Sequence, residues 1–119
     1  MVRLLLRRGA NPNIGNKDNL TPLQSAAHHG NIAIVRMLLK AGAKVNSADL
    51  RYGYTALASA TQNGHIEVVR ELLIAGADPK LRLNNGWTVA ELARQKGWHQ
   101  IEQLLLAAAP SARQAEESK

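Results

Sequence analysis

An internal repeat constrains the fold of this chain more than any other feature. The segments "GANPN" at 9–13, "GAKVN" at 42–46 and "GADPK" at 76–80 lie 33 and 34 residues apart. A second set, "TPLQSAAHHGN", "TALASATQNGH" and "TVAELARQKGW", begins at Thr21, Thr55 and Thr88, with spacings of 34 and 33. Two independent markers therefore fix one register. Self-similarity at this period is typical of solenoid proteins.

Each unit begins with the signals of a short helix. A threonine N-cap stands at Thr21, Thr55 and Thr88. Pro22 suits the first helical position, and Gln24 and Glu91 are predicted to complete capping boxes in the first and last units. Ala58 has no side-chain acceptor, so the middle helix should start without the reciprocal bond. Each of these helices should stop at a glycine, namely Gly30, Gly64 or Gly97.

A longer helix with an apolar stripe follows each glycine. Its apolar residues recur at spacings of three and four: Ile32, Val35, Leu38 and Leu39, then Ile66, Val69, Leu72 and Leu73, then Ile101, Leu104 and Leu105. The 119 residues suggest one domain. Because hydrophobic residues make up 45% of the chain and aromatic residues only 3%, the core must consist of Leu, Ile, Val and Ala, which favours helices.

The order of helix, turn, longer helix and loop, with "TPL" opening the first helix and "LLKAGAKVN" and "LLIAGADPK" closing the second, resembles the ankyrin repeat. The resemblance divides a single domain at 1–109 into a half repeat at 2–15, repeats at 16–48 and 49–82, and a terminal repeat at 83–109. The histidine usual after "TPL" is replaced by Gln24, Ala58 and Glu91. The hydrogen bonds at this position should therefore differ from the family pattern.

The resemblance implies an all-α solenoid of helix-turn-helix units whose loops project as fingers beside a concave surface. Such arrays bind other proteins. The chain is therefore expected to be a non-catalytic protein–protein interaction module, with no cofactor and no small-molecule substrate. The partner should meet the loop tips and the inner-helix face.

Both tyrosines lie in the central loop, within "DLRYGYTALASA" at 49–60. Alignment of the units matches Gly53 with Asn19 and Gly86, and it places Leu20, Tyr54 and Trp87 directly before the capping threonines. Aromatic residues and Arg dominate interface hot spots. The alternative is that these side chains pack the bases of the fingers. The full predicted partner-binding set is Lys17, Asp18, Leu20, His28, His29, Leu50, Arg51, Tyr52, Tyr54, Gln62, Asn63, Asn84, Asn85, Trp87, Gln95 and Lys96.

A metal or catalytic site is not expected. Four histidines, His28, His29, His65 and His99, invite a metal hypothesis. However, His28 and His29 should diverge on a helix, and no cysteine or carboxylate pair completes a ligand set. Ser25 and Ser59 are expected in a row of small packing residues, and no glycine-rich phosphate loop is present.

The basic charge supports a rival interpretation. The formal net charge is +6, and residues 1–48 hold seven basic side chains against Asp18 alone: Arg3, Arg7, Arg8, Lys17, Arg36, Lys40 and Lys44. Such a basic N-terminal face would suit nucleic acid or another acidic surface, including an acidic protein. Nucleic acid is the weaker alternative, because neither interleaved aromatic residues nor a known reading motif accompanies the charge.

The two ends of the chain carry separate expectations. Residues 1–8 look like a second helix without its first, so either self-association through this uncapped helix or fraying of the helix is expected. The leucines of "VRLLLRRG" are too few for a membrane span or a signal peptide, and a soluble intracellular protein is the default expectation. The tail at 110–119 is polar and expected to be disordered. The family also contains asparagines that become substrates of an oxygenase, with a Leu eight residues upstream, and Asn13 and Asn46 match this spacing. The simpler alternative is that both asparagines bond the loop backbone.

Overall fold

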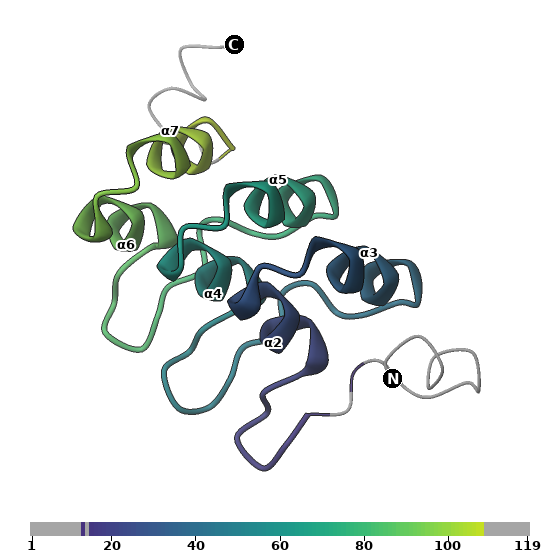
Figure 1. Ribbon diagram of the computed structural model, residues 1–119. Helices are drawn as coiled ribbons and strands as arrows, with labels where there is room; N and C mark the ends of the chain where they lie inside the picture. Colours follow the sequence, from purple (N-terminus) through teal and green to yellow (C-terminus); the bar gives the residue numbers. More distant parts are fainter. Residues whose placement is uncertain (1–12, 14, 109–119) are drawn as a thin grey trace, which may run out of the picture.

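The computed structural model describes residue 13 and residues 15–108. In this part of the chain the helices are α2 (Pro22–His29), α3 (Ile32–Lys40), α4 (Ala56–Gln62), α5 (Ile66–Ile74), α6 (Val89–Lys96) and α7 (His99–Ala108). Figure 1 shows α2, α4 and α6 in one row and α3, α5 and α7 in a second row, with long loops projecting beneath the first row. The predicted all-α solenoid of helix-turn-helix units is confirmed.

The threonine caps position the inner helices, which are α2, α4 and α6; α3, α5 and α7 are the outer helices. The Thr21 side chain accepts a hydrogen bond from the Gln24 N–H, and Gln24 Oε1 accepts one from the Thr21 N–H at 2.7 Å, so the first capping box is formed. Thr55 caps α4 through the Ala58 N–H alone, as predicted.

The second capping box, predicted at Thr88, is wrong. The Thr88 hydroxyl accepts from the Glu91 N–H at 3.3 Å and donates to Glu91 Oε1 at 3.4 Å. The reciprocal bond from the Thr88 N–H to the Glu91 carboxylate does not form in the described structure. Thr88 also faces Arg82 in an isolated antiparallel bridge, beside which the Leu83 N–H donates to Trp87 O at 2.8 Å.

The core lies between the two helical layers. In the described residues its buried hydrophobic side chains are all Leu, Val, Ile or Ala, as the composition predicts. The largest of them are at most 2% exposed: Leu23, Leu38, Leu57, Leu72, Leu105, Val35, Val68 and Val69. Burying one such Leu or Val side chain stabilises the fold by about 1.5–3 kcal/mol. The small residues on α2 and α4 allow the inner helices to approach closely, because Ala27, Ala56, Ala58 and Ala60 are fully buried.

Rings at the starts of the outer helices join successive repeats. His65 Nε2 lies 3.0 Å from the carbonyl oxygen of His28, and Trp98 Nε1 donates to the carbonyl oxygen of Gln62 at 3.3 Å. Each acceptor stands two residues before the positive-φ glycine, Gly30 or Gly64, that follows the previous inner helix. The two bonds are therefore equivalent, although the rings differ.

Asparagine side chains join the loops on the opposite side of the stack. Asn13 donates to the carbonyl oxygen of Gly42 at 3.3 Å and accepts from the Lys44 N–H at 2.6 Å. Asn46 repeats both bonds one unit later, with Gly76 O at 3.3 Å and the Asp78 N–H at 2.8 Å. The remainder of the predicted half repeat at 2–12 and 14, the self-association assigned to it, and the tail at 110–119 lie outside the described residues.

Candidate functional site: a groove between the fingers and the inner helices

The fingers are three loop tips: the first finger (15–20), the central finger (49–54) and the last finger (83–87). Their backbones are joined in series, because the Leu50 N–H donates to Asp18 O at 2.8 Å and the Asn84 N–H donates to Tyr52 O at 2.9 Å. Asn19, Gly53 and Gly86 all have positive φ, at 59°, 73° and 87°. Their predicted equivalence is therefore confirmed, and Asn19 is the tolerated non-glycine member of the series.

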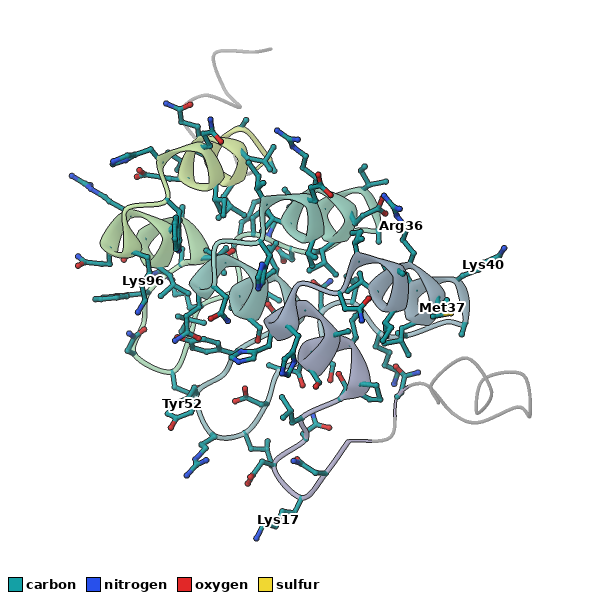
Figure 2. All side chains as sticks on the ribbon, in the orientation of Figure 1. Lys17, Arg36, Met37, Lys40, Tyr52 and Lys96 are labelled. Carbon is teal, nitrogen blue, oxygen red and sulfur yellow. The ribbon has the colours of Figure 1, made fainter. Side chains whose placement is uncertain are left out.

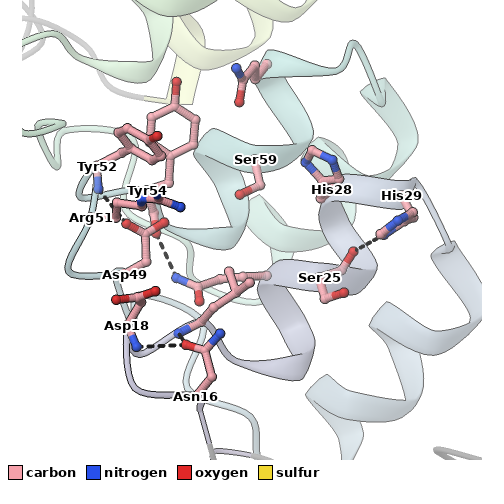
Figure 3. A pocket seen from close by; sticks show the side chains of 13 residues that line it. Asn16, Asp18, Ser25, His28, His29, Asp49, Arg51, Tyr52, Tyr54 and Ser59 are labelled. Atoms are coloured by element: carbon pink, nitrogen blue, oxygen red, sulfur yellow. Dashed lines mark hydrogen bonds between the residues drawn. The ribbon is translucent and has the colours of Figure 1, made fainter.

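A concave groove of about 530 Å³ lies between the first two fingers and the helices α2 and α4. Figure 3 shows the finger residues along one side of this groove and the histidines of α2 on the other. Half of the predicted binding residues line it: Asp18, Leu20, His28, His29, Arg51, Tyr52, Tyr54 and Gln62. Residues from the predicted set therefore contribute to both walls of the groove.

The other predicted residues lie outside the groove. They occupy the finger tips, the last finger and the ends of α4 and α6: Lys17, Leu50, Asn63, Asn84, Asn85, Trp87, Gln95 and Lys96. None of the sixteen predicted side chains is buried. Tyr54 and Trp87 are half-buried and pack against the hydrophobic core. These two side chains therefore partly fit the alternative prediction, in which they pack the bases of the fingers.

Sequence reasoning missed five residues that line the groove: Asn16, Gln24, Ser25, Asp49 and Ser59. Ser25 is exposed, whereas Ser59 is buried like the neighbouring small residues, so the predicted packing row contains only the second serine. A signal was present in the repeat alignment. Ser25 and Ser59 are both serine at one repeat position, and Asn16 and Asp49 are both hydrogen-bonding residues at another.

Polar side chains hold the fingers in shape. Asn16 Oδ1 accepts from the Asp18 and Leu20 N–H groups at 2.9 and 3.0 Å. Asp49 Oδ1 does the same for the central finger, accepting from the Tyr52 N–H at 2.7 Å and the Gly53 N–H at 3.1 Å. A side-chain oxygen that accepts from amides a few residues on is the usual way in which Asn and Asp stabilise turns.

Gln24 connects the floor of the groove to the central finger. Its Nε2 donates to the carbonyl oxygens of Ser47 at 2.9 Å and Tyr54 at 2.7 Å, while its Oε1 serves the capping box. The side chain is 1% exposed. Glutamine in place of the usual histidine therefore makes a complete set of local bonds, and the position is fully satisfied.

The tyrosines form an aromatic cluster with Arg51 on the central finger. Tyr52 and Tyr54 meet edge to face with their ring centroids 6.0 Å apart, and the Arg51 guanidinium carbon lies 5.6 Å from the Tyr52 ring centroid. Tyr52 is 57% exposed. Burial raises the pKa of Tyr54, and the charges of Asp49 and Tyr52 raise that pKa further.

The histidines at the end of α2 do not diverge as predicted. The His28 and His29 rings meet edge to face at 5.1 Å, because the exposed end of the helix allows both imidazoles to turn toward each other. His29 Nδ1 lies 2.8 Å from Ser25 O, and His28 Nδ1 lies 3.0 Å from Asn63 Nδ2. Within the described residues, no group of three or more His, Cys, Asp or Glu side chains is arranged to hold a metal ion.

The structure describes four of the seven basic residues behind the nucleic-acid hypothesis: Lys17, Arg36, Lys40 and Lys44. Arg3, Arg7 and Arg8 lie outside the described residues. Of the rest, Figure 2 shows Lys17 at the tip of the first finger and Arg36 and Lys40 on α3, on a different part of the surface. Arg36 also forms an ion pair with Glu71 of α5 at 3.0 Å. In the described structure, Lys17 therefore lies apart from Arg36 and Lys40.

The comparison with known families agrees with this architecture. A family model described as "Ankyrin repeats (3 copies)" matches residues 1–83. The chain belongs to the ankyrin-repeat family. Ankyrin repeats are generally non-catalytic protein–protein interaction modules. None of the described helices is long and apolar enough to cross a lipid bilayer.

Individual relatives share parts of this ankyrin-repeat chain. An "Ankyrin repeat and LEM domain-containing protein 1 homolog" of Caenorhabditis elegans is 47% identical over 55 residues, which cover 46% of this chain and 8% of that protein. An "Ankyrin repeat and SAM domain-containing protein 6" of Rattus norvegicus is 42% identical over 80 residues, or 67% of this chain and 9% of that protein. A putative ankyrin repeat protein of fowlpox virus is 49% identical over 45 residues, or 38% of this chain and 6% of that protein. The chain thus spans less than a tenth of each relative.

Proposed function

We propose that this ankyrin-repeat chain binds an extended segment of a partner protein in the groove between its fingers and inner helices. The observation that carries the proposal is the exposed cluster of Arg51 and Tyr52, supported by Tyr54, which forms one wall of a groove of about 530 Å³. Tyr and Arg are enriched among the residues that contribute most binding energy at interfaces. The opposite wall offers imidazole and amide groups that orient a peptide backbone.

The scaffold supports this role because the groove is built on fixed elements. Each finger is closed by side-chain and backbone hydrogen bonds, and Gln24 ties the central finger to α2. Preorganised walls reduce the conformational entropy lost on binding. The thirteen residues that line the groove are fewer than the about 20–30 residues that each partner contributes to a standard interface. The proposed contacts therefore extend to the tips at Lys17 and Leu50, and to the predicted residues of the last finger and the end of α6: Asn84, Asn85, Trp87, Gln95 and Lys96.

Site-specific photo-cross-linking tests the location. A benzophenone amino acid is placed at Tyr52 or His29, on opposite walls of the groove, and at Ile74 as the control, because Ile74 is 83% exposed on α5 outside the groove. After irradiation in a host extract, the same partner should be cross-linked from positions 52 and 29 and not from position 74.

Quantitative binding completes the test once that partner is purified. Tyr52→Ala should weaken its affinity by at least about tenfold, as expected of a hot-spot residue. Ile74→Ala removes a comparably exposed apolar side chain and should leave the affinity unchanged. Cross-linking from position 74 alone, or full affinity in Tyr52→Ala, would show that the partner uses another surface.

A further inference from the structure

We infer that the segment held in this groove presents a Lys or Arg side chain to Asp18 and Asp49, next to an apolar residue that packs on the tyrosines. This inference rests on the proposed function, because it names the chemistry of the partner at the same groove. It runs against the charge of the whole chain, which is +6 and would favour an acidic partner. The aspartates that line the groove instead favour a basic side chain in the bound segment.

The groove is lined by two aspartates and by one side chain of the Lys and Arg type, Arg51. Figure 3 shows Asp18 and Asp49 on the finger side of the groove, and the two fingers that carry them are joined at this point, where the Leu50 N–H donates to Asp18 O at 2.8 Å. The two carboxylates thus reinforce each other's negative potential at one place. A cation approaching this place gains from both, and an acidic side chain is repelled by both.

Neither aspartate is neutralised within the described structure. The ion pair found among the described residues joins Arg36 and Glu71 on the outer helices. The Asp18 carboxylate makes no hydrogen bond or ion pair in the described part of the chain, since only its backbone N–H and carbonyl are engaged. Asp49 uses Oδ1 for the turn of the central finger, and its second oxygen remains available.

Arg51 does not provide the missing cation. Its guanidinium carbon lies 5.6 Å from the centroid of the Tyr52 ring, and no ion pair to Asp49 or Asp18 is formed. The guanidinium is therefore placed over an aromatic face, a known arrangement for Arg. The two carboxylates are left for a charge supplied from outside.

The tyrosines add the apolar half of the recognition. The stem of a Lys or Arg side chain packs on apolar surface while its head remains at a polar group. Tyr52 and Tyr54 provide such a surface in the same finger as Asp49, with Tyr52 57% exposed. A basic residue with an apolar neighbour therefore fits both the charge and the shape of this wall.

Peptide selection tests the charge preference directly. A random peptide library displayed on phage is selected against the wild type, and the selected sequences are compared with the unselected library. Lys and Arg should be enriched and Asp and Glu depleted. A selected peptide, and its analogue with the Lys or Arg replaced by Gln, are then synthesised for affinity measurements.

The double variant Asp18→Asn/Asp49→Asn removes both charges without removing the turn. Asn16 already shows that an asparagine Oδ1 holds a finger of this kind by accepting from two loop amides. The matched control is Glu67→Gln/Asp78→Asn, which changes the net charge equally on residues outside the groove. The double variant should weaken binding of the basic peptide by about tenfold, and the control should not.

The double-mutant cycle identifies the pair of groups responsible. The Gln analogue should bind the wild type and the Asp18→Asn/Asp49→Asn variant with equal affinity, because the interaction has already been removed from the peptide side. The inference is overturned if the peptides that require Tyr52 are enriched in acidic residues. It is also overturned if they bind Asp18→Asn/Asp49→Asn with the same affinity as the wild type. In both cases the groove is still a binding site. If no selected peptide loses affinity in Tyr52→Ala, the proposed function fails as well.

Discussion

The indole ring of Trp98 lies directly over Gly64, so that a Cβ atom added to this glycine would come within 2.9 Å of the ring. The same relationship holds one repeat earlier, where a Cβ atom on Gly30 would come within 2.6 Å of the His65 ring. Gly97 occupies the equivalent position in the last unit and has nothing within 4 Å. The three glycines therefore share one backbone role but differ in what covers them.

Substitution of these glycines separates backbone strain from packing between repeats. Gly64 and Gly97 both have positive φ, at 72° and 80°. Gly97→Ala should lower the free energy of unfolding by about 1–2 kcal/mol from backbone strain. Gly64→Ala should cost about 1–3 kcal/mol more, because the indole ring must move. Urea denaturation of both variants measures the difference, and equal losses would refute a close packing role for the ring.

Gln24→Ala should destabilise the fold although it removes no charge. The variant leaves the Thr21 N–H and the carbonyl oxygens of Ser47 and Tyr54 without their side-chain partner in a buried environment. Losing these bonds should lower the free energy of unfolding by about 2–4 kcal/mol. Glu91→Ala at the equivalent position should cost under about 1 kcal/mol, since Glu91 is exposed and makes no capping box. Denaturation curves that rank the two variants the other way would contradict this assignment.

Tyr54 should ionise at unusually high pH. In the Tyr52→Phe variant it is the one tyrosine left in the chain, so the phenolate absorbance reports it alone. Burial raises the pKa of Tyr54, and its titration midpoint should lie above the ordinary tyrosine value of about 10. Adding Asp49→Asn should lower the midpoint, because that negative charge also raises the pKa.

The raised pKa of Tyr54 also predicts how the stability of the fold changes with pH. Because the pKa of Tyr54 is higher in the folded state, the neutral phenol favours folding. This contribution is complete below the unfolded value near pH 10 and is lost as the pH rises through the raised pKa of Tyr54. Tyr54→Phe should therefore make the unfolding free energy less dependent on pH in this alkaline range. A Tyr54 midpoint at or below 10 would exclude the effect.

The ion pair between Arg36 and Glu71 should contribute little to stability. Its side chains are 60% and 29% exposed, so water screens the 3.0 Å contact. A double-mutant cycle with Arg36→Ala and Glu71→Ala should give a coupling energy below about 1 kcal/mol, decreasing further in high salt. A larger coupling that persists in salt would mean that the pair holds α3 against α5.

The repeat pattern predicted the helices because each local signal acts over a few residues. Threonine caps, glycine stops and apolar stripes occur where the helices begin, end and bury a face. The second capping box failed because the Glu91 carboxylate accepts from the Thr88 hydroxyl, at 3.4 Å, and not from the Thr88 N–H. The spacing of Thr and Glu is the same in both arrangements, so it could not distinguish them.

The groove was predicted in part for a related reason. Alignment of the units identified the finger and helix positions that face the same side, including Tyr52 and His28. The alignment did not show how far each loop residue lies from the groove, so Asn16 and Asp49 were not predicted to line it. The distance between a finger and the neighbouring inner helix depends on bonds such as that from Gln24 to Tyr54, which joins residues 30 positions apart.

The serial ties between neighbouring repeats have a mechanical consequence. Asn13 is bonded to Gly42, Asn46 to Gly76, His65 to the carbonyl of His28 and Trp98 to that of Gln62. Under tension along the stack, these links bear the load one after another, so the weakest junction sets the yield force of the described array. A bound segment that contacts both the first and the central finger would share the load at the junction between them. Ligand binding would therefore raise the force needed to separate these two repeats.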